Sequence, residues 1–168
     1  MTRKILGAVL LLIIAGFGYQ MFHYQWSNLD YAPEQPIPFS HKLHAGDRNI
    51  PCMYCHTNVE RSRHATIPSM NICMNCHSVV NVDSTSIIKL TEAYNSGKPL
   101  EWQRIHKVPE HAYFSHKWHI RKGFDCAVCH GPVETMDRVY QYRKLNMGDC
   151  IQCHRENEAP TSCNTCHQ

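Results

Sequence analysis

The chain has 168 residues and a formal net charge of +3, and all ten of its cysteines occur in closely spaced pairs. The mild positive charge and a pI near 8.3 do not favour a nucleic-acid-binding protein, so we expect no nucleic acid among its partners. So many cysteines in a short chain favour either a disulfide-bonded exported protein or a protein that binds a metal or cofactor.

Residues 1–26 are expected to form an N-terminal transmembrane anchor. An apolar run of eighteen residues, Ile5 to Phe22, contains Gln20 as its only strongly polar residue. A helix rising 1.5 Å per residue would span about 27 Å over this length, close to the thickness of the hydrocarbon core. Arg3 and Lys4 precede the run and would keep the N-terminus in the cytoplasm.

A cleaved signal peptide is the alternative for this segment. Its apolar region is normally shorter, and no A-x-A-like cleavage site is evident between Gly18 and Asn28. In both cases the rest of the chain is exported. We therefore expect a single-pass protein of a bacterial cytoplasmic membrane, in contact with the lipid bilayer, with its main domain on the periplasmic side. Residues 27–38 carry three prolines and are expected to form an extended linker.

Five copies of one pattern, C-x-x-C-H, account for all ten cysteines. We number these copies sites 1 to 5 in chain order. Their cysteines and histidines are Cys52, Cys55 and His56; Cys73, Cys76 and His77; Cys126, Cys129 and His130; Cys150, Cys153 and His154; and Cys163, Cys166 and His167.

The C-x-x-C-H pattern indicates covalent attachment of a c-type haem. Each cysteine thiol would add to one haem vinyl group, and the adjacent histidine would become the proximal ligand of the iron. Disulfides do not explain a histidine after every pair, zinc sites do not require it, and a thioredoxin-like motif is expected once per domain. The expected cofactors are five haem c groups, one per site.

A short motif occurs twice ahead of these sites. Phe39 to His44 reads FSHKLH and Phe114 to His119 reads FSHKWH, each followed by a glycine and two C-x-x-C-H sites. The repeat predicts a pentahaem domain over residues 39–168, with two di-haem modules at 39–83 and 106–155, a connecting helix at 84–105 and a fifth site at 156–168. The helical signal between the modules runs from Ser84 to Gly97.

The expected fold is mainly α-helical and irregular, with one N-terminal transmembrane helix. No alternating run is long enough to predict a sheet. About 130 residues would share five haems, so we expect porphyrins to fill much of the core.

An electron-transfer haem of low spin needs a second axial ligand. The paired histidines of the repeat are the strongest candidates, because positions i and i+3 of a helical turn project from neighbouring points. The expected distal ligands are His41, His44, His116, His119 and, as the fifth, His106. The less certain candidates are His64, His111, Met147 and Met136, and a methionine ligand would raise the reduction potential.

The F-S-H-x-x-H motif before C-x-x-C-H resembles the small multihaem cytochromes of the c3 and c7 type. This resemblance implies that His41 serves site 1 and that His116 serves site 3. The anchor, the segment IPSMNICMNCHSVV, the motif W-x-x-I-H-K-V-P and the ending MGDCIQCHR…CNTCH also resemble the pentahaem cytochrome c subunit (ActA) of alternative complex III, a membrane quinol:electron-acceptor oxidoreductase.

This second resemblance implies an electron-transfer subunit with other membrane subunits as partners. Electrons would pass from quinol oxidation to a monohaem cytochrome c, a high-potential iron–sulfur protein or a terminal oxidase. We expect no catalytic residues. Two alternatives stay open, a self-contained membrane-anchored quinol dehydrogenase and a multihaem reductase with one open haem site.

Overall fold

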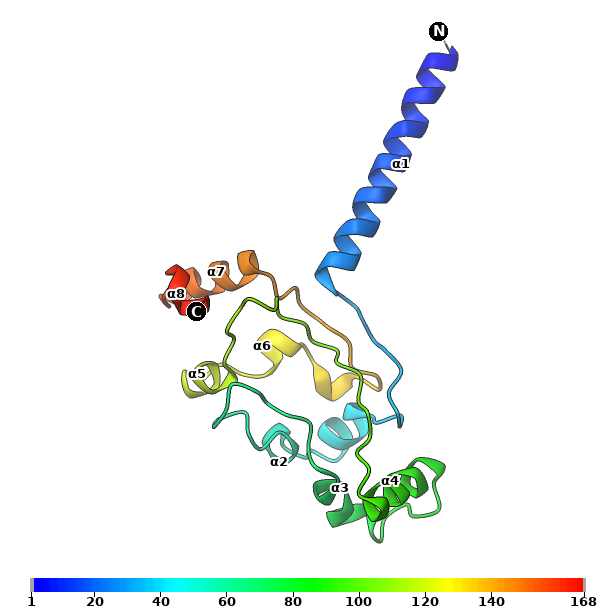
Figure 1. Cartoon of the computed structure of the whole chain (residues 1–168), viewed down its shortest axis with the longest axis vertical. Coiled ribbons are helices and arrows are strands. Elements are labelled where there is room, and N and C mark those ends of the chain that lie inside the picture. Colours follow the sequence, from blue (N-terminus) through cyan, green and yellow to red (C-terminus); the bar gives the residue numbers. More distant parts are fainter. Residues whose placement is uncertain (1, 168) are drawn as a thin grey trace.

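The computed structural model describes residues 2–167, and for residues 2–4 and 23–26 it describes the backbone alone. The predicted positions of the Arg3 and Lys4 side chains therefore lie outside the described residues. One long helix projects from a domain built of short helices and irregular segments (Figure 1). No strand occurs within residues 2–167, so the predicted helical and irregular fold class is confirmed.

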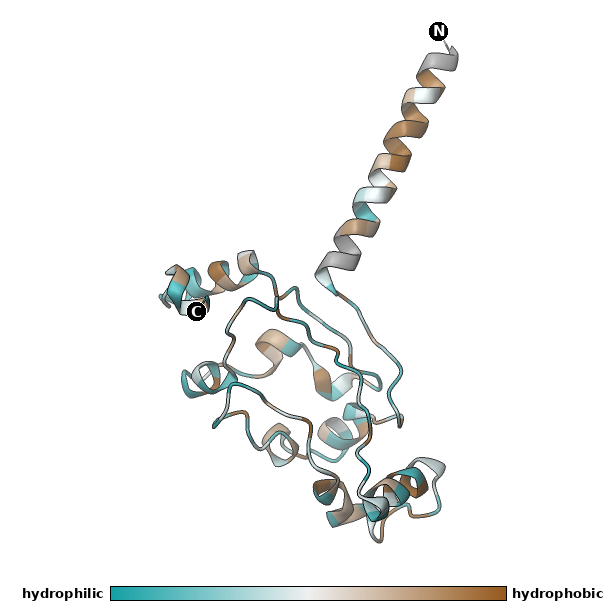
Figure 2. Cartoon of the chain, in the orientation of Figure 1, coloured by the Kyte–Doolittle hydropathy of each residue, from teal (hydrophilic) through white to brown (hydrophobic). Residues whose placement is uncertain are grey.

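The projecting helix, α1, spans Thr2–Ser27. Its window from Ile5 to Phe22 has a mean hydropathy of 2.1, is 0% buried, and is long and apolar enough to cross a membrane. Figure 2 shows it as the most continuous apolar segment of the chain. A signal sequence near the N-terminus passes the same test of length and hydropathy, so the helix alone does not separate the two alternatives.

Each C-x-x-C-H site forms a helical turn. The helices are α2 (Cys52–Cys55), α3 (Met70–His77), α6 (Ala127–His130), α7 (Met147–Glu156) and α8 (Cys163–Cys166). The longer α7 begins at a true cap, since the Asn146 side chain accepts a hydrogen bond from the Asp149 amide at 3.1 Å. The other helical elements are the π-helical turn η1 (Lys42–Asp47), α5 (His116–Arg121) and the 3₁₀ turn η2 (Val133–Thr135).

Helix α4 (Thr85–Ser96) fills only part of the segment 84–105 in which a connecting helix was predicted. It ends because Gly97 adopts a left-handed conformation with φ 68°, which costs glycine little, and Pro99 follows two residues later. Residues 97–105 are irregular. The helix buries Ile87 and Leu90, the i and i+3 positions of the predicted apolar face.

The apolar core made by protein side chains alone is small. Among the described residues its buried apolar members are Ile37, Val59, Ile87, Leu90, Met136 and Val139. Six such side chains are few for a domain of this size. The polypeptide therefore wraps an interior to which its own apolar side chains contribute little.

The predicted linker 27–38 is extended, but it does not stand free of the domain. Asp30 donates its amide to the Gln141 carbonyl at 2.9 Å, and Gln35 exchanges two hydrogen bonds with the backbone of Gln103. Lys89 donates to the Pro36 carbonyl at 2.7 Å. Hydrogen bonds therefore attach this segment to the domain at several points along its length. The proline content from which the linker was predicted gave no sign of these bonds.

Candidate haem sites

The ten cysteines are all free thiols, at partly or fully exposed positions. Within each site the two cysteines stand three residues apart on one helical turn, so both side chains project from the same side. This arrangement suits the attachment of both thiols to one planar group. It comes from the local helix and does not require a distant part of the chain.

The imidazoles at these sites are oriented by backbone carbonyls. A carbonyl oxygen can only accept, so a ring nitrogen bonded to it carries the proton and the other nitrogen is left free as a metal ligand. Among the histidines of the C-x-x-C-H sites, Nδ1 donates to a backbone carbonyl from His56 to Thr66 (2.7 Å), from His77 to Val80 (3.0 Å), from His154 to Pro160 (2.6 Å) and from His167 to His111 (3.0 Å).

Three of the predicted distal histidines are held in the same way. Nδ1 donates from His44 to the Ser40 carbonyl (2.8 Å), from His119 to the Ser115 carbonyl (2.8 Å) and from His116 to the Arg63 carbonyl (2.9 Å). In all seven rings the free nitrogen is Nε2. Such fixing of the tautomer by an outer hydrogen bond is usual for histidines that bind a metal.

Three imidazole pairs have ring-centroid separations close to the spacing that a shared metal requires. Because a metal–imidazole bond is about 2 Å long, two rings on opposite sides of one metal have centroids about 6 Å apart. The centroid separations are 6.1 Å for His44 and His77, 6.0 Å for His119 and His154, and 6.2 Å for His116 and His130. These pairs bring the predicted distal ligands to the histidines of sites 2, 4 and 3.

The two copies of the repeat have the same geometry. Phe39 stands edge-on to His41 (4.8 Å, 85°) and stacks on His44 (4.4 Å, 24°). In the second copy Phe114 lies 4.8 Å from His116 at 87° and 4.6 Å from His119 at 32°. The phenylalanine thus orients both imidazoles of each pair, which gives a physical reason for its place in the motif.

Sites 1 and 3 share a cluster of half-buried imidazoles. Burial, followed by the charges of His56 and His44, lowers the pKa of His41 to about 4. The Nδ1 atom of His41 is buried and has no hydrogen-bond partner among the described residues. The electrostatic effect of His56 on His41 shows that His41 lies close to the histidine of site 1.

His106 enters the same cluster from the irregular segment after α4. Its Nε2 lies 3.2 Å from Nδ1 of His130, and the two rings meet edge-to-face at 4.4 Å. Burial, followed by the charges of neighbouring histidines, lowers the pKa of both side chains to about 4. His106 therefore lies at site 3 and contacts the nitrogen of His130 that would face away from a metal.

The other candidate ligands have different surroundings. The His111 ring lies 5.4 Å from that of His167, and its carbonyl accepts the Nδ1 hydrogen of the same residue, so His111 belongs to site 5. His64 is exposed and close to His116. Met147 is 57% exposed at the start of α7, whereas Met136 is 5% exposed and accepts the Lys42 amide at its carbonyl, as a core residue would.

Sites 2 and 1 are neighbours in space. The Asn75 amide, between the cysteines of site 2, donates to the Tyr54 hydroxyl, between those of site 1, at 3.1 Å. Burial raises the pKa of the Cys55 thiol, and the nearby Cys73 thiol adds to the increase. These contacts connect α3 to α2.

The remaining sites continue from site 1 in a single row. The Cys52 thiol of site 1 lies close enough to Cys126 of site 3 to raise its pKa, in addition to the larger effect of burial. The Cys153 thiol of site 4 lies close enough to Cys129 of site 3 to raise its pKa, in addition to the larger effect of burial, and Cys166 of site 5 similarly affects Cys150. The spatial order is therefore 2–1–3–4–5, and α3, α2, α6, α7 and α8 follow one another across the domain in this order (Figure 1).

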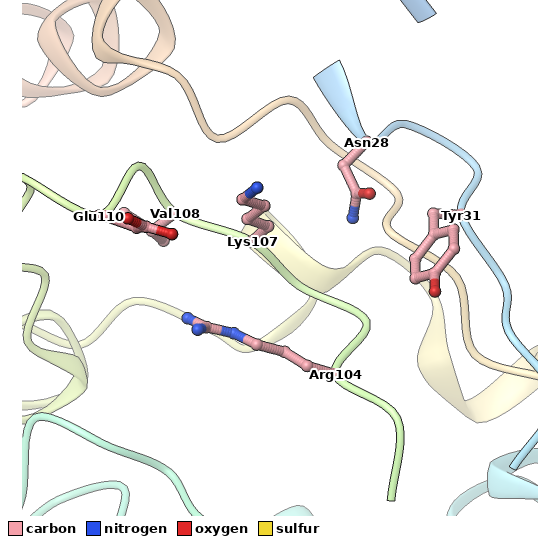
Figure 3. A pocket seen from close by; sticks show the side chains of 6 residues that line it. All are labelled: Asn28, Tyr31, Arg104, Lys107, Val108 and Glu110. Atoms are coloured by element: carbon pink, nitrogen blue, oxygen red, sulfur yellow. The ribbon is translucent and has the colours of Figure 1, made fainter. Parts of the chain in front are cut away.

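A hollow of about 280 Å³ lies at the foot of α1. Figure 3 shows its lining residues, which are Asn28, Tyr31, Arg104, Lys107, Val108 and Glu110. Two come from the segment that follows α1, and four come from the segment around His106. The hollow thus brings two cations and one carboxylate to the domain surface nearest α1.

Sequence reasoning missed the groups that hold these imidazoles. The acceptors at Arg63, Thr66, Val80 and Pro160 are backbone carbonyls, which leave no mark in the sequence. It also missed Gln141, a fully buried side chain near site 3. A lone glutamine between two tyrosines gives no pattern that could have identified it.

The residues present fit covalently bound haem. In each site two thiols stand three residues apart on one face of a helical turn. Seven imidazoles keep Nε2 free, and the ring centroids of three imidazole pairs lie about 6 Å apart. Together these groups form the donor set of a c-type haem with two histidine ligands.

Comparison with known proteins supports the same chemistry. Residues 112–168 match the family model described as cytochrome c7 and related cytochrome c. The chain is also 30% identical over 162 residues to the "Menaquinone reductase, multiheme cytochrome c subunit" of Nitratidesulfovibrio vulgaris (strain Hildenborough). This similarity covers 80% of the present chain and 77% of that protein.

Proposed function

The chain belongs to the family of multihaem cytochrome c subunits that includes this Nitratidesulfovibrio protein. From that membership we propose that it relays electrons through five covalently bound haems on the periplasmic side of a bacterial cytoplasmic membrane. The observation that carries the proposal is the set of three imidazole pairs beside the C-x-x-C-H helices, whose ring centroids lie 6.0–6.2 Å apart. When bound, haem iron supplies reversible one-electron oxidation and reduction.

The contribution of the chain is to bind and arrange these groups. The ten cysteines of sites 1 to 5 attach them, and the histidine of each site is the proximal ligand. We assign His41, His44, His116 and His119 as distal ligands of sites 1, 2, 3 and 4. The backbone carbonyls that accept from Nδ1 make each imidazole a stronger ligand and fix the plane of its ring.

The row of sites defines the path of the relay through the domain. Sites 2 and 5 are its two ends, so they are the points at which electron donors and acceptors would approach. Helices α3 and α4 lie at the end of the domain remote from α1, so site 2 is the end farthest from the membrane (Figure 1).

The spatial order can be tested by removing one site at a time. Cys52→Ala with Cys55→Ala deletes interior site 1 and would isolate site 2. Cys163→Ala with Cys166→Ala deletes terminal site 5 and leaves the other four connected. We expect one haem to be reduced slowly in the first variant, and all remaining haems to be reduced together in the second. Equal behaviour of the two variants would contradict the order.

The distal ligand still to be assigned is that of site 5; the sequence favours His106, whose ring lies at site 3. The Nε2 atom of His106 contacts His130, so binding a metal would require this contact to break. His111 lies beside site 5 and is the alternative. Low-temperature EPR of His106→Ala and His111→Ala distinguishes them, since loss of a distal ligand converts one haem to the high-spin form. A high-spin signal in His111→Ala alone would transfer the assignment to that residue.

We propose that the physiological partners are other membrane subunits of a quinone-reactive complex. The resemblance to alternative complex III favours electron flow from quinol to a monohaem cytochrome c, a high-potential iron–sulfur protein or a terminal oxidase. The relative from Nitratidesulfovibrio is described as part of a menaquinone reductase, which favours the opposite direction. Purification in mild detergent, with identification of the co-purifying chains, tests for the complex.

The direction of flow is tested with the purified complex. Reduction of the haems by a menaquinol analogue, faster than by a reduced c-type cytochrome, supports quinol oxidation, and the reverse preference supports quinone reduction. Failure of both donors to reduce the haems would contradict the proposed function.

The hollow at the foot of α1 favours a second candidate, a cytochrome with its own quinol site. Arg104 and Lys107 could donate hydrogen bonds to the head group and Glu110 could accept a proton. This candidate requires the isolated chain, without partner subunits, to be reduced by a quinol analogue. In the same assay the variant Glu110→Gln should be reduced more slowly than the wild type. If the isolated wild-type chain is not reduced by the quinol analogue, the candidate is excluded.

A further inference from the structure

Gln141 is the one described polar residue that is fully buried, with 0% of its surface exposed. Its Oε1 accepts from the Asn28 side chain at 3.0 Å and from the Lys107 amide at 2.9 Å. Its Nε2 donates to the carbonyls of Ser27 at 2.9 Å and Arg143 at 3.1 Å. Both donors and both acceptor positions of the side-chain amide are therefore used, which holds it in one orientation.

The backbone of Gln141 adds two bonds to the same segment. Asp30 donates its amide to the Gln141 carbonyl at 2.9 Å, and the Gln141 amide donates to the Tyr31 carbonyl at 3.2 Å. Asn28 in turn donates to the Ile105 carbonyl at 2.7 Å. Residues 27–31, at the end of α1 and directly after it, are thus bonded to two other segments of the domain in one cluster around the buried Gln141.

These bonds connect the membrane helix to site 3. Ser27 is the last residue of α1, and Lys107 follows His106, whose ring contacts His130. A single side chain therefore bridges the end of the anchor and the segment that places an imidazole at the site. A free tether would show no such buried, saturated hydrogen bonding, because exposed linkers bond to water.

We propose that Gln141 is a positioning residue that locks the membrane helix to the haem domain, so that the domain stands at a fixed height and orientation on the membrane. The significance of this lock for electron transfer rests on the proposed function. A fixed orientation suits transfer to a partner held in the same membrane, whereas a swinging domain suits exchange between distant partners.

Oriented-membrane EPR tests the lock directly. The full-length protein with its haems is reconstituted into stacked bilayers, and its low-spin signals are recorded as the sample is rotated in the field. We expect the wild-type signal amplitudes to vary strongly with angle. Gln141→Leu keeps a similar volume but removes all four side-chain bonds, and it should lose at least about half of this variation.

Haem content and spin state, measured on the same samples, separate this test from that of the proposed function. We expect both to be unchanged in Gln141→Leu. The matched control is Gln152→Leu, an exposed glutamine on α7 whose side chain bonds only to Glu156 among the described residues, and it should keep the wild-type angular pattern. An unaltered pattern in Gln141→Leu, or no angular dependence in the wild type, would overturn the lock.

Hydrogen exchange of the wild-type protein keeps the proposal testable if Gln141→Leu fails to fold. The amides of Asp30, Lys107 and Gln141 should exchange at least about tenfold more slowly than that of Thr57 in an exposed turn. Exchange at the same rate in all four would overturn the lock, whatever the haem content of the sample.

Discussion

Gly131, directly after the histidine of site 3, provides a sharp test of the local backbone geometry. Its φ of 71° and ψ of −167° lie in a region that residues with a side chain occupy only under strain. An added Cβ would also overlap the Tyr142 ring, with Cδ2 only 2.6 Å away. Backbone strain of about 1–3 kcal/mol and overpacking of about 1–3 kcal/mol predict that Gly131→Ala lowers the free energy of unfolding by about 4 kcal/mol.

Gly97 is the matched control for this substitution. It also has a positive φ, 68°, but nothing lies within 4 Å of an added Cβ, so Gly97→Ala should cost only about 1 kcal/mol. Denaturant unfolding of both holoproteins, followed by far-UV circular dichroism, measures the difference. Because the Tyr142 ring is partly exposed, adding Tyr142→Ala to Gly131→Ala should recover about 2 kcal/mol, the overpacking share. Equal destabilisation by Gly131→Ala and Gly97→Ala would refute the reasoning.

The remaining predictions concern the sites. His119→Ala should convert one low-spin haem to high spin in the EPR spectrum, because it removes the imidazole that faces His154, whereas the exposed His64→Ala should leave all haems low-spin. Cys163→Ala with Cys166→Ala should reduce the intact mass by one haem and leave the other four attached, and loss of more than one would show that the sites fold as a unit. Burial lowers the pKa of three imidazoles in the polypeptide to about 4, those of His41, His106 and His130. The unfolded chain binds protons at these groups below about pH 6.5 while the folded chain does not, so the free energy of unfolding should be constant above that pH and fall as the pH drops from 6.5 to 4. Denaturant midpoints that do not change across this window would contradict the assignment.

The candidate sites could be proposed from the sequence because their chemistry requires residues close together in the chain. The C-x-x-C-H pattern spaces two thiols three residues apart, and the structure adds that each of the five copies forms a helical turn. The repeat at Phe39 and Phe114 predicted two equivalent histidine pairs, and their ring geometries agree within 0.2 Å. Gly97 likewise ends α4 where the sequence predicted a stop.

Contacts between distant segments were not predictable from pattern. The segment 27–38 was expected to be an extended linker, and its hydrogen bonds reach Gln103 and Gln141, more than sixty residues away. The spatial order 2–1–3–4–5 differs from the chain order because the domain folds back on itself between α4 and α6. Both features depend on which backbone groups meet, and a local sequence window contains no such information.

The central claim is that each of the five cysteine pairs carries one covalently bound haem, and intact mass spectrometry of the chain purified from bacterial membranes tests it directly. We expect the mass of the polypeptide plus five haems, unchanged after denaturation and thiol reduction because thioether bonds resist both. A mass without added haem, or one reporting disulfides between the cysteines, would contradict the claim.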